Sequence, residues 1–327
     1  MGHRSREEAM RTCMNRLFDR GADVSTQGNV EAVARHGWRL HARLLIRPAL
    51  SILIVVFLSS CVSGEDSEAD LLGRFDRDKD LYLAHFDVKT DVDDVHSVAA
   101  VATMLADPRF SGIRYHAVAG AYGTQDGLYV PAEEVFEMAF GAHWSDAHEN
   151  FDKALAEVRL LSVETLDDGG SIWIAEAGQS DFSAALIRSI REMTPESTLE
   201  HRIHVVQHSD WNEEVTTAED LAFVKEYATY RKIPDGNGIG NGSPGFRSET
   251  IVNWKEHVSD ARLREIWTAA VEISNTYNGA DGRYLNEAIR DGGLDFSDVA
   301  ETAWIFGFSE LRDANDFFEE FSGTKGG

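Results

Sequence analysis

The 327-residue sequence predicts an α/β fold, with a doubly wound, mainly parallel sheet, helices on both faces and a helical C-terminal third. Three observations predict it. Short apolar runs alternate with segments of helical periodicity. The first run, 81–86, is apolar at successive positions, as in a strand buried on both faces. An acidic turn follows that run directly, at the end of the strand where open parallel sheets bind their ligands.

Four strands are expected in the first two thirds of the chain, at 81–86, 113–118, 171–175 and 203–207. Apolar residues spaced three and four apart predict helices between and after them. These helices are expected at 95–105, 132–140, 151–163, 182–193 and 219–230. The repeated order of strand and then helix is typical of a parallel sheet with crossover helices.

From about residue 260 onward the periodicity is helical. Leu263, Ile266 and Trp267 mark one helix, and residues 311–321 mark the last. Between them, Asp298 opens a further helix. The glycine-rich segment 236–245 neither closes a strand nor opens a helix, so it is interpreted as a loop, either on the surface or over the site, and not as a dinucleotide fingerprint.

The net charge of −25 is unevenly distributed. Residues 1–60 contain nine Arg and five acidic residues and carry about +4, so the remainder carries about −29. A body this acidic argues against the phosphate backbone of a nucleic acid as a partner.

The N-terminal region predicts export and lipid attachment. Arg43 and Arg47 precede an apolar run at 52–58 that suits a signal peptide and is too short for a permanent membrane span. The sequence Leu58-Ser-Ser-Cys61 resembles a bacterial lipobox, which implies that Cys61 is lipidated and becomes the mature N-terminus. The alternative is a buried hydrophobic segment that ends in a cysteine by chance.

These signals divide the chain into four parts. Residues 1–38 are an upstream extension or a mis-assigned start, 39–60 the signal peptide, 61–75 the lipidated Cys61 and an acidic tether, and 76–327 the folded domain. The expected location is the bacterial cell envelope, as a periplasmic or outer-membrane lipoprotein that touches the membrane only through its lipid anchor. Cys13 is the only other cysteine, so the mature chain is expected to lack a disulfide.

The acidic turn after the first strand needs compensation for its charge. Asp93 and Asp94 alone would suit the start of a helix, where backbone N–H groups are free. Asp87 and Asp91 lie outside that helix and add like charge. Hard carboxylate oxygens converging at a turn are what Ca²⁺ selects, and six to eight oxygens are needed. A distant carboxylate and a backbone carbonyl are therefore expected to complete the shell.

Two other interpretations of the acidic stretches compete with this one. Asp76, Asp78 and Asp80 alternate as in an EF-hand loop, but Leu81 stands where that loop needs Gly. The stretch from Asp87 to Thr90 imitates the nucleophile motif of haloacid-dehalogenase-type phosphatases, but their second Asp is missing.

The strand, Asp87, the Asp93-Asp94 pair and the apolar helix together resemble the N-terminal motif of the inosine/uridine-preferring nucleoside hydrolase superfamily, whose usual form is Asp-x-Asp-Pro-Gly-x-Asp-Asp. Residues 174–186 are similar to a later turn of that family, and Asp298 is similar to its late Asp. The resemblance covers about 80–306. It implies a bound Ca²⁺ that grips the ribose 2′ and 3′ hydroxyls, and an Asp that activates water to attack the anomeric carbon.

The chain departs from the family motif in two places. Without a gap, the family's second Asp falls on Lys89, whose ammonium could take the place of the metal. If the turn is two residues longer, Asp87 takes that position and His85 replaces the first Asp, and this alignment is favoured. The family's late His falls on Ser297, so His208, with Asp210 nearby to raise its pKa, is the candidate proton donor.

The resemblance implies a role for each candidate residue. Asp87 acts as general base and metal ligand, and His208 as general acid or as a structural strand-end His. Asp94, Asp298 and Asp181 complete the Ca²⁺ ligands, and Asp93 accepts from a sugar hydroxyl. Trp211 and Asn212 bind the base and the sugar, unless Trp211 belongs to the core.

The implied activity is hydrolysis of the N-glycosidic bond of a ribonucleoside or a related ribosyl glycoside. The rival hypothesis is a non-catalytic nucleoside- or carbohydrate-binding lipoprotein on the same fold, which Lys89 and Ser297 favour. Either way the expected partner is a small nucleoside or sugar and not a nucleic acid. The sequence leaves open the preferred base and whether the protein forms a homo-oligomer.

Overall fold

The computed structural model describes residues 70–321. The predicted extension, signal peptide and lipidated Cys61 lie outside the described residues. In the part that the structure describes, no helix is both long and apolar enough to cross a membrane.

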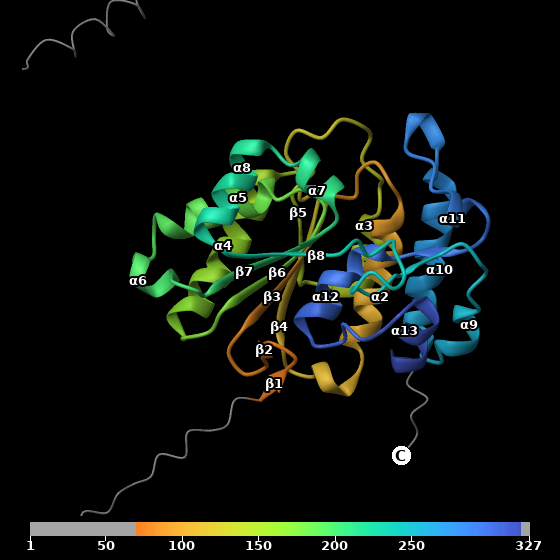
Figure 1. Cartoon of the computed structure of the whole chain (residues 1–327), viewed down its shortest axis with the longest axis horizontal. Helices are drawn as coiled ribbons and strands as arrows, with labels where there is room; N and C mark the ends of the chain where they lie inside the picture. The colour runs from red at the N-terminus through yellow and green to blue at the C-terminus, as the bar shows by residue number, and fades with distance from the viewer. Residues whose placement is uncertain (1–69, 322–327) are drawn as a thin grey trace, which may run out of the picture. The chain divides into compact units, whose positions relative to one another are not determined.

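A six-stranded, all-parallel sheet forms the centre of the fold, with the strand order β5-β4-β3-β6-β7-β8 (Figure 1). The strands are β3 (Leu81–Phe86), β4 (Arg114–Ala119), β5 (Trp144–Asp146), β6 (Ile172–Ala177), β7 (Ile203–His208) and β8 (Thr229–Ile233). The first strand of this sheet in the sequence is β3. The next two strands, β4 and β5, are added on one side of β3, and β6, β7 and β8 are then added on its other side. The topological switch point therefore lies between β3 and β6, and this confirms the predicted doubly wound α/β class.

Helices cover both faces of the sheet (Figure 1). One face carries α4 (Phe151–Asp167), α5 (Asp181–Arg191) and α8 (Ala218–Tyr227), and the other carries α2 (Asp93–Leu105), α3 (Glu133–Phe140) and α10 (Ala261–Tyr277). Successive residues of β3 belong to two different apolar clusters: Leu81 and Leu83 face the first group of helices, and Tyr82 and Ala84 face the second. This explains why β3 is apolar at nearly every position.

The C-terminal third is mainly helical, as predicted. After α10 come α11 (Glu287–Arg290), α12 (Ala300–Ile305) and α13 (Ala314–Phe321). The smaller elements are β1 (Leu71–Leu72), β2 (Phe75–Asp76), α6 (Glu196–Leu199), α7 (Asp210–Val215), β9 (Arg247–Ser248), α9 (Trp254–His257) and β10 (Leu294–Asp295). The antiparallel pair of β9 and β10 brings the segment after the glycine-rich loop next to the segment that contains Asp298.

Three details differ from the sequence-based expectations. The edge strands β5 and β8 were not predicted, because β5 has three residues and β8 exposes most of its side chains. The helix expected to reach Tyr230 ends at Tyr227, since β8 begins at Thr229. The described part of the predicted tether, residues 70–75, belongs to the folded unit: Phe75 is fully buried, and the backbone N–H of Arg74 donates to the carbonyl of Ile305 (2.9 Å).

Partly buried histidines make the stability of the fold depend on pH. His204 of β7 stacks on Trp173 with a ring-centroid distance of 3.9 Å, and burial, followed by the nearby His201, lowers its pKa to about 4. The unfolded chain binds a proton at this position below about pH 6.5, whereas the folded chain does so only below about pH 4. The contribution of His204 to stability is therefore present above pH 6.5 and lost as the pH falls toward 4.

We expect His204→Phe to keep the ring stacking and remove this titration. Relative to the wild type, the free energy of unfolding of the variant should rise by roughly 2–3 kcal/mol as the pH falls from 6.5 to 4. Urea denaturation of both proteins across this range measures the difference. A difference that stays constant with pH would contradict the assignment.

Candidate metal and active site

Three carboxylates converge where β3 passes into α2. Oxygens of Asp93 and Asp94, at the start of α2, and of Asp298, in the turn before α12, all lie within 4.8 Å of one another. They line a cavity of about 540 Å³ at the carboxyl ends of β3, β6 and β7. We call Asp93, Asp94 and Asp298 the acidic trio.

The turn from β3 to α2 folds around its own carboxylates. Val88 adopts a positive φ of 53°, which is unfavourable for a β-branched residue, and its N–H donates to Oδ2 of Asp94 (2.5 Å). The N–H of Lys89 donates to Oδ1 of Asp87 (2.9 Å), and the N–H of Val130 donates to the carbonyl of Val88 (2.9 Å). These bonds hold Asp87 and Asp94 in the cavity wall in spite of the strained backbone.

The electrostatics of the acidic trio favour a cation. Burial raises the pKa of Asp93 and of Asp94 well above the usual value, and repulsion from neighbouring carboxylates raises both further. Burial also raises the pKa of Asp298 well above its usual value. Oδ1 of Asp94 is buried and has no hydrogen-bond partner among the described residues. Carboxylate oxygens with unused acceptor capacity fit a hard divalent cation such as Ca²⁺.

Asp87 lies in the same cavity, beside the acidic trio but not within it. Burial raises its pKa to about 7, partly offset by the hydrogen bond from Lys89. Gly178, after β6, makes room for this carboxylate, because a Cβ on Gly178 would come within 2.5 Å of Oδ2 of Asp87. The predicted turn after β6 therefore does meet the acidic turn.

Asp91 is held by neighbours. Both of its carboxylate oxygens accept from Nδ2 of Asn286 (3.3 Å each), and the same amide donates to Asp295 (2.8 Å). Burial and the charge of Asp295 raise the pKa of Asp91 to about 6. Asp91 therefore links the acidic turn to the C-terminal third.

Lys89 does not occupy the place of a metal. Its Nζ lies 4.1 Å from the ring centroid of Tyr122, a cation–π geometry. The phenolic oxygen of Tyr122 in turn contacts Nδ1 of His148 (2.5 Å). The ammonium of Lys89 is thus engaged by an aromatic ring, although Lys89 itself lines the cavity.

His208, the last residue of β7, lies between two carboxylates. Its Nδ1 is 2.8 Å from Oε1 of Glu301, and its Nε2 is 3.9 Å from Oδ1 of Asp298. Burial alone would lower the pKa of His208, but Glu301, Asp298 and Asp235 raise it to about 9. The expected partner, Asp210, is exposed and pairs with Lys232, so Glu301 takes the role that the sequence suggested for Asp210.

The cavity also contains the two predicted substrate-binding residues. Trp211 is 63% exposed, which is against a place in the core, and Asn212 is buried at the beginning of α7. Sequence reasoning missed other lining residues: Gln125, Asp235, Asn237, Arg247 and Tyr284. Asp235 and Asn237 lie at the start of the glycine-rich loop, which thus meets the cavity at one end, whereas residues 239–242 of the loop are exposed.

Asp181, predicted as a metal ligand, is not brought to the acidic trio. It begins α5, and its carboxylate accepts from the N–H of Thr217 (3.3 Å). Asp80, from the alternative calcium loop, is also engaged elsewhere, because it accepts from the N–H of Ser171 (2.7 Å) and from the indole of Trp173 (2.8 Å). Both carboxylates serve the packing of the sheet and its turns.

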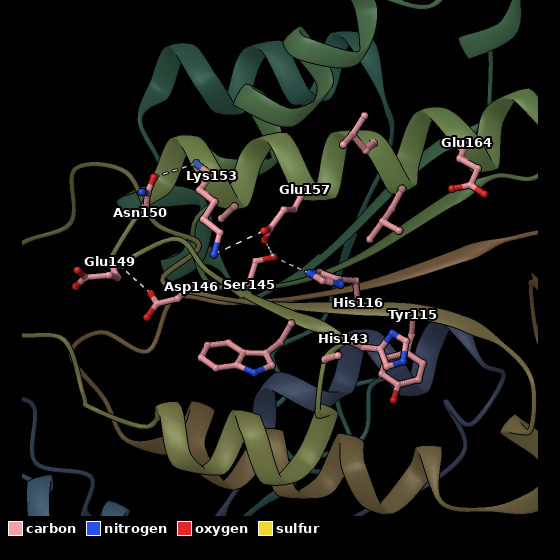
Figure 2. Close-up of a pocket in the computed structure, with 15 residues that line it drawn as sticks. Tyr115, His116, His143, Ser145, Asp146, Glu149, Asn150, Lys153, Glu157 and Glu164 are labelled. Atoms are coloured by element: carbon pink, nitrogen blue, oxygen red, sulfur yellow. Dashed lines mark hydrogen bonds and ion pairs between the residues drawn. The ribbon is translucent and has the colours of Figure 1, made fainter.

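A second cavity, of about 660 Å³, lies at the β5 edge of the sheet and shares no lining residue with the first. Figure 2 shows Ser145 between His116 and Glu157. Nε2 of His116 is 2.7 Å from Oγ of Ser145, which donates to Glu157 (2.8 Å). In a nucleophilic triad the His stands between the Ser and the acid. Here the Ser stands in the middle, so we interpret His116, Ser145 and Glu157 as a hydrogen-bonded bridge between β4, β5 and α4.

Comparisons of the chain with protein family models, with curated proteins and with solved structures gave no match.

The placement of the trio leads to a metal-binding test. We expect Ca²⁺ to raise the free energy of unfolding of the wild type by about 3 kcal/mol at a hundredfold excess over the dissociation constant. Asp94→Asn keeps an acceptor for the N–H of Val88 and removes the charge, so this variant should be more stable than the wild type in chelator and should lose the response to Ca²⁺.

Asp181→Asn is the matched control, because it removes a nearby buried carboxylate outside the acidic trio. This variant should respond to Ca²⁺ like the wild type. Thermal unfolding with Ca²⁺ and with chelator measures all three proteins. An equal Ca²⁺ response in Asp94→Asn and Asp181→Asn would count against the trio as the metal site.

Proposed function

We propose that the protein hydrolyses the N-glycosidic bond of a ribonucleoside or related ribosyl glycoside, with a Ca²⁺ ion held by the acidic trio. The observation that carries this proposal is the acidic trio, in which Asp94 and Asp298 are buried and Asp93 is half-buried, with the unpartnered Oδ1 of Asp94, in one cavity with Asp87 and His208. Such a cavity offers a metal site, a carboxyl group and an ion-paired imidazole at the switch point of the sheet.

Asp93, Asp94 and Asp298 would hold the ion. A bound Ca²⁺ supplies ligand positions for the vicinal hydroxyls of a ribose and lowers the pKa of bound water. Asp93 is also placed at the cavity wall to accept from a sugar hydroxyl, the role that its position in the acidic turn suggested.

Asp87 is the proposed general base. A carboxyl with a pKa of about 7 is a stronger base than an ordinary carboxylate and is substantially ionised at neutral pH. In the proposed step, the water oxygen forms a bond to the anomeric carbon, the carbon–nitrogen bond breaks, and Asp87 accepts the proton of the water. The positive charge that develops on the sugar ring is stabilised by the surrounding carboxylates.

His208 is the proposed general acid. With a pKa of about 9 it carries a proton at neutral pH, which it can give to the leaving nitrogen of the base. Glu301 accepts from the backbone N–H of His208 (2.7 Å) and pairs with Nδ1 of the same residue (2.8 Å). Glu301 thus holds the backbone of the proton donor and lies beside its ring, although Nδ1 makes no hydrogen bond within the described residues. Trp211 is exposed within the cavity wall, where an aromatic base can stack.

The second candidate is a non-catalytic nucleoside- or carbohydrate-binding protein on the same fold. It is favoured by Ser297, which stands where many members of the resembling family carry a His as proton donor. The two candidates share the cavity and the metal, so ligand binding does not separate them. Release of free base from the ligand does.

We expect Asp87→Asn to lower kcat for base release from inosine or uridine by about 10²–10⁴-fold, because it removes the base and keeps the acceptor for Lys89. His208→Gln should show a smaller loss with substrates whose leaving group needs no proton, such as p-nitrophenyl riboside. Spectrophotometric assays in Ca²⁺ measure both. Binding of nucleoside without release of base by the wild type would favour the non-catalytic candidate.

The proposed location is the bacterial cell envelope, through a lipid on Cys61. The order of Arg43, Arg47, the apolar run and Cys61 supports it. In cells, Cys61→Ala should block incorporation of labelled fatty acid and release the protein from the membrane fraction. Incorporation that persists in this variant would contradict the assignment.

A further inference from the structure

Arg247 places a cation in the wall of the acidic cavity with its hydrogen-bond donors unused. It lies in β9, and its side chain is 22% exposed. Its nearest carboxylate oxygen belongs to Asp295, 3.7 Å from Nη1, which is too long for a hydrogen bond. Within residues 70–321 its guanidinium makes no hydrogen bond. Five N–H donors are therefore free for a ligand.

Burial raises the pKa of Asp295 and the charge of Arg247 lowers it, but the hydrogen bonds of Asp295 come from other residues. One of its oxygens accepts from the hydroxyl (2.9 Å) and the N–H (3.2 Å) of Ser297, and the other accepts from Nδ2 of Asn286 (2.8 Å). Neutral donors from the same C-terminal segment thus satisfy this fully buried carboxylate. The charge of Asp295 keeps the guanidinium near the cavity without using its donors.

The other cationic groups of the cavity wall are engaged. The ammonium of Lys89 lies over the ring of Tyr122, and the imidazole of His208 is paired with Glu301. No nitrogen of Arg247 is among the buried side-chain atoms that lack a partner, so its donors face the cavity and are open to a ligand that replaces water. Of the described residues that line the cavity, Arg247 is thus the cation that is available to a ligand.

We propose that Arg247 binds an anionic group of the substrate, so that the site takes a ribonucleoside with a phosphate or a carboxylate in preference to a neutral one. This inference rests on the proposed function. The planar fork of a guanidinium matches both oxyanions through two parallel N–H···O bonds. The carboxylates of the remaining wall repel an anion, so the anionic group is directed to the guanidinium of Arg247, and the sugar remains beside the acidic trio.

Three substrates test this inference and distinguish the two sources of the anionic group. Inosine is neutral, inosine 5′-monophosphate carries a phosphate on the sugar, and orotidine carries a carboxylate on the base. In Ca²⁺, the wild type should show a kcat/KM for at least one anionic substrate about 10- to 100-fold above that for inosine. A preference for inosine 5′-monophosphate identifies a phosphate as the bound group, and a preference for orotidine identifies a carboxylate.

Arg247→Met should abolish this preference, and Arg247→Lys should keep part of it. The ratio of kcat/KM values for two substrates is measured within one preparation, so a partly unfolded variant does not disturb it. Arg231→Met is the matched control, because Arg231 is exposed, lies over Trp304 and does not line the cavity. This control should keep the wild-type ratio.

The inference is overturned if the wild type prefers inosine to both anionic substrates, or if Arg247→Met keeps the wild-type ratio. Thermal shift with ribose and with ribose 5-phosphate, in Ca²⁺, separates it from the hydrolase proposal. Suppose that no substrate releases base, but ribose 5-phosphate stabilises the wild type more than it stabilises Arg247→Met. The hydrolase proposal then fails, and Arg247 is supported as a binding site for phosphate. If base is released and the Arg247→Met ratio is unchanged, the hydrolase stands and the anion site fails.

Discussion

The constraint on which the site depends is the repulsion between buried carboxylates at the switch point of the sheet. Asp93, Asp94 and Asp298 have oxygens within 4.8 Å of one another, and Asp87 lies in the same cavity wall. In a medium of low dielectric, such an arrangement is stable only if protons or a cation neutralise part of the charge. Two features position these carboxylates: the strained turn at Val88 and the space left by Gly178. The ion pair of His208 balances part of their charge.

The sheet supplies the geometry that brings these groups together. Because β3 and β6 are neighbours although β4 and β5 lie between them in sequence, the turns after β3 and β6 meet at one point. The C-terminal third then completes the cavity wall: Asp298 lines it, Glu301 of the same segment contacts His208, and Asn286 links Asp91 to Asp295. The helical third is thus part of the site and not an addition to the sheet.

The sequence was sufficient for the fold class and for the centre of the site, because both depend on strong local signals. The apolar run of β3, the acidic turn and the later strand ends carry their own periodicity or charge. Edge strand β8 was missed because solvent covers much of it, so it lacks an apolar pattern.

Glu301 could have been noticed as an acid in an apolar helix, but its partner His208 is 93 positions away and only the tertiary structure pairs them. The same holds for Arg247, which sequence gives no reason to single out. Asp181 shows the opposite case, since a promising motif position turns out to stabilise a neighbouring loop.

The double contact of Glu301 with His208 also has a consequence for the order in which the chain matures. Asp93 and Asp94 are made early in synthesis, whereas Asp298 and Glu301 emerge near its end. The cavity therefore depends on contacts between parts of the chain that are about 200 residues apart in sequence. A chain that has not yet received its last helices has neither the complete acidic trio nor the partner of His208. The candidate site is therefore complete only when the C-terminal segment has docked.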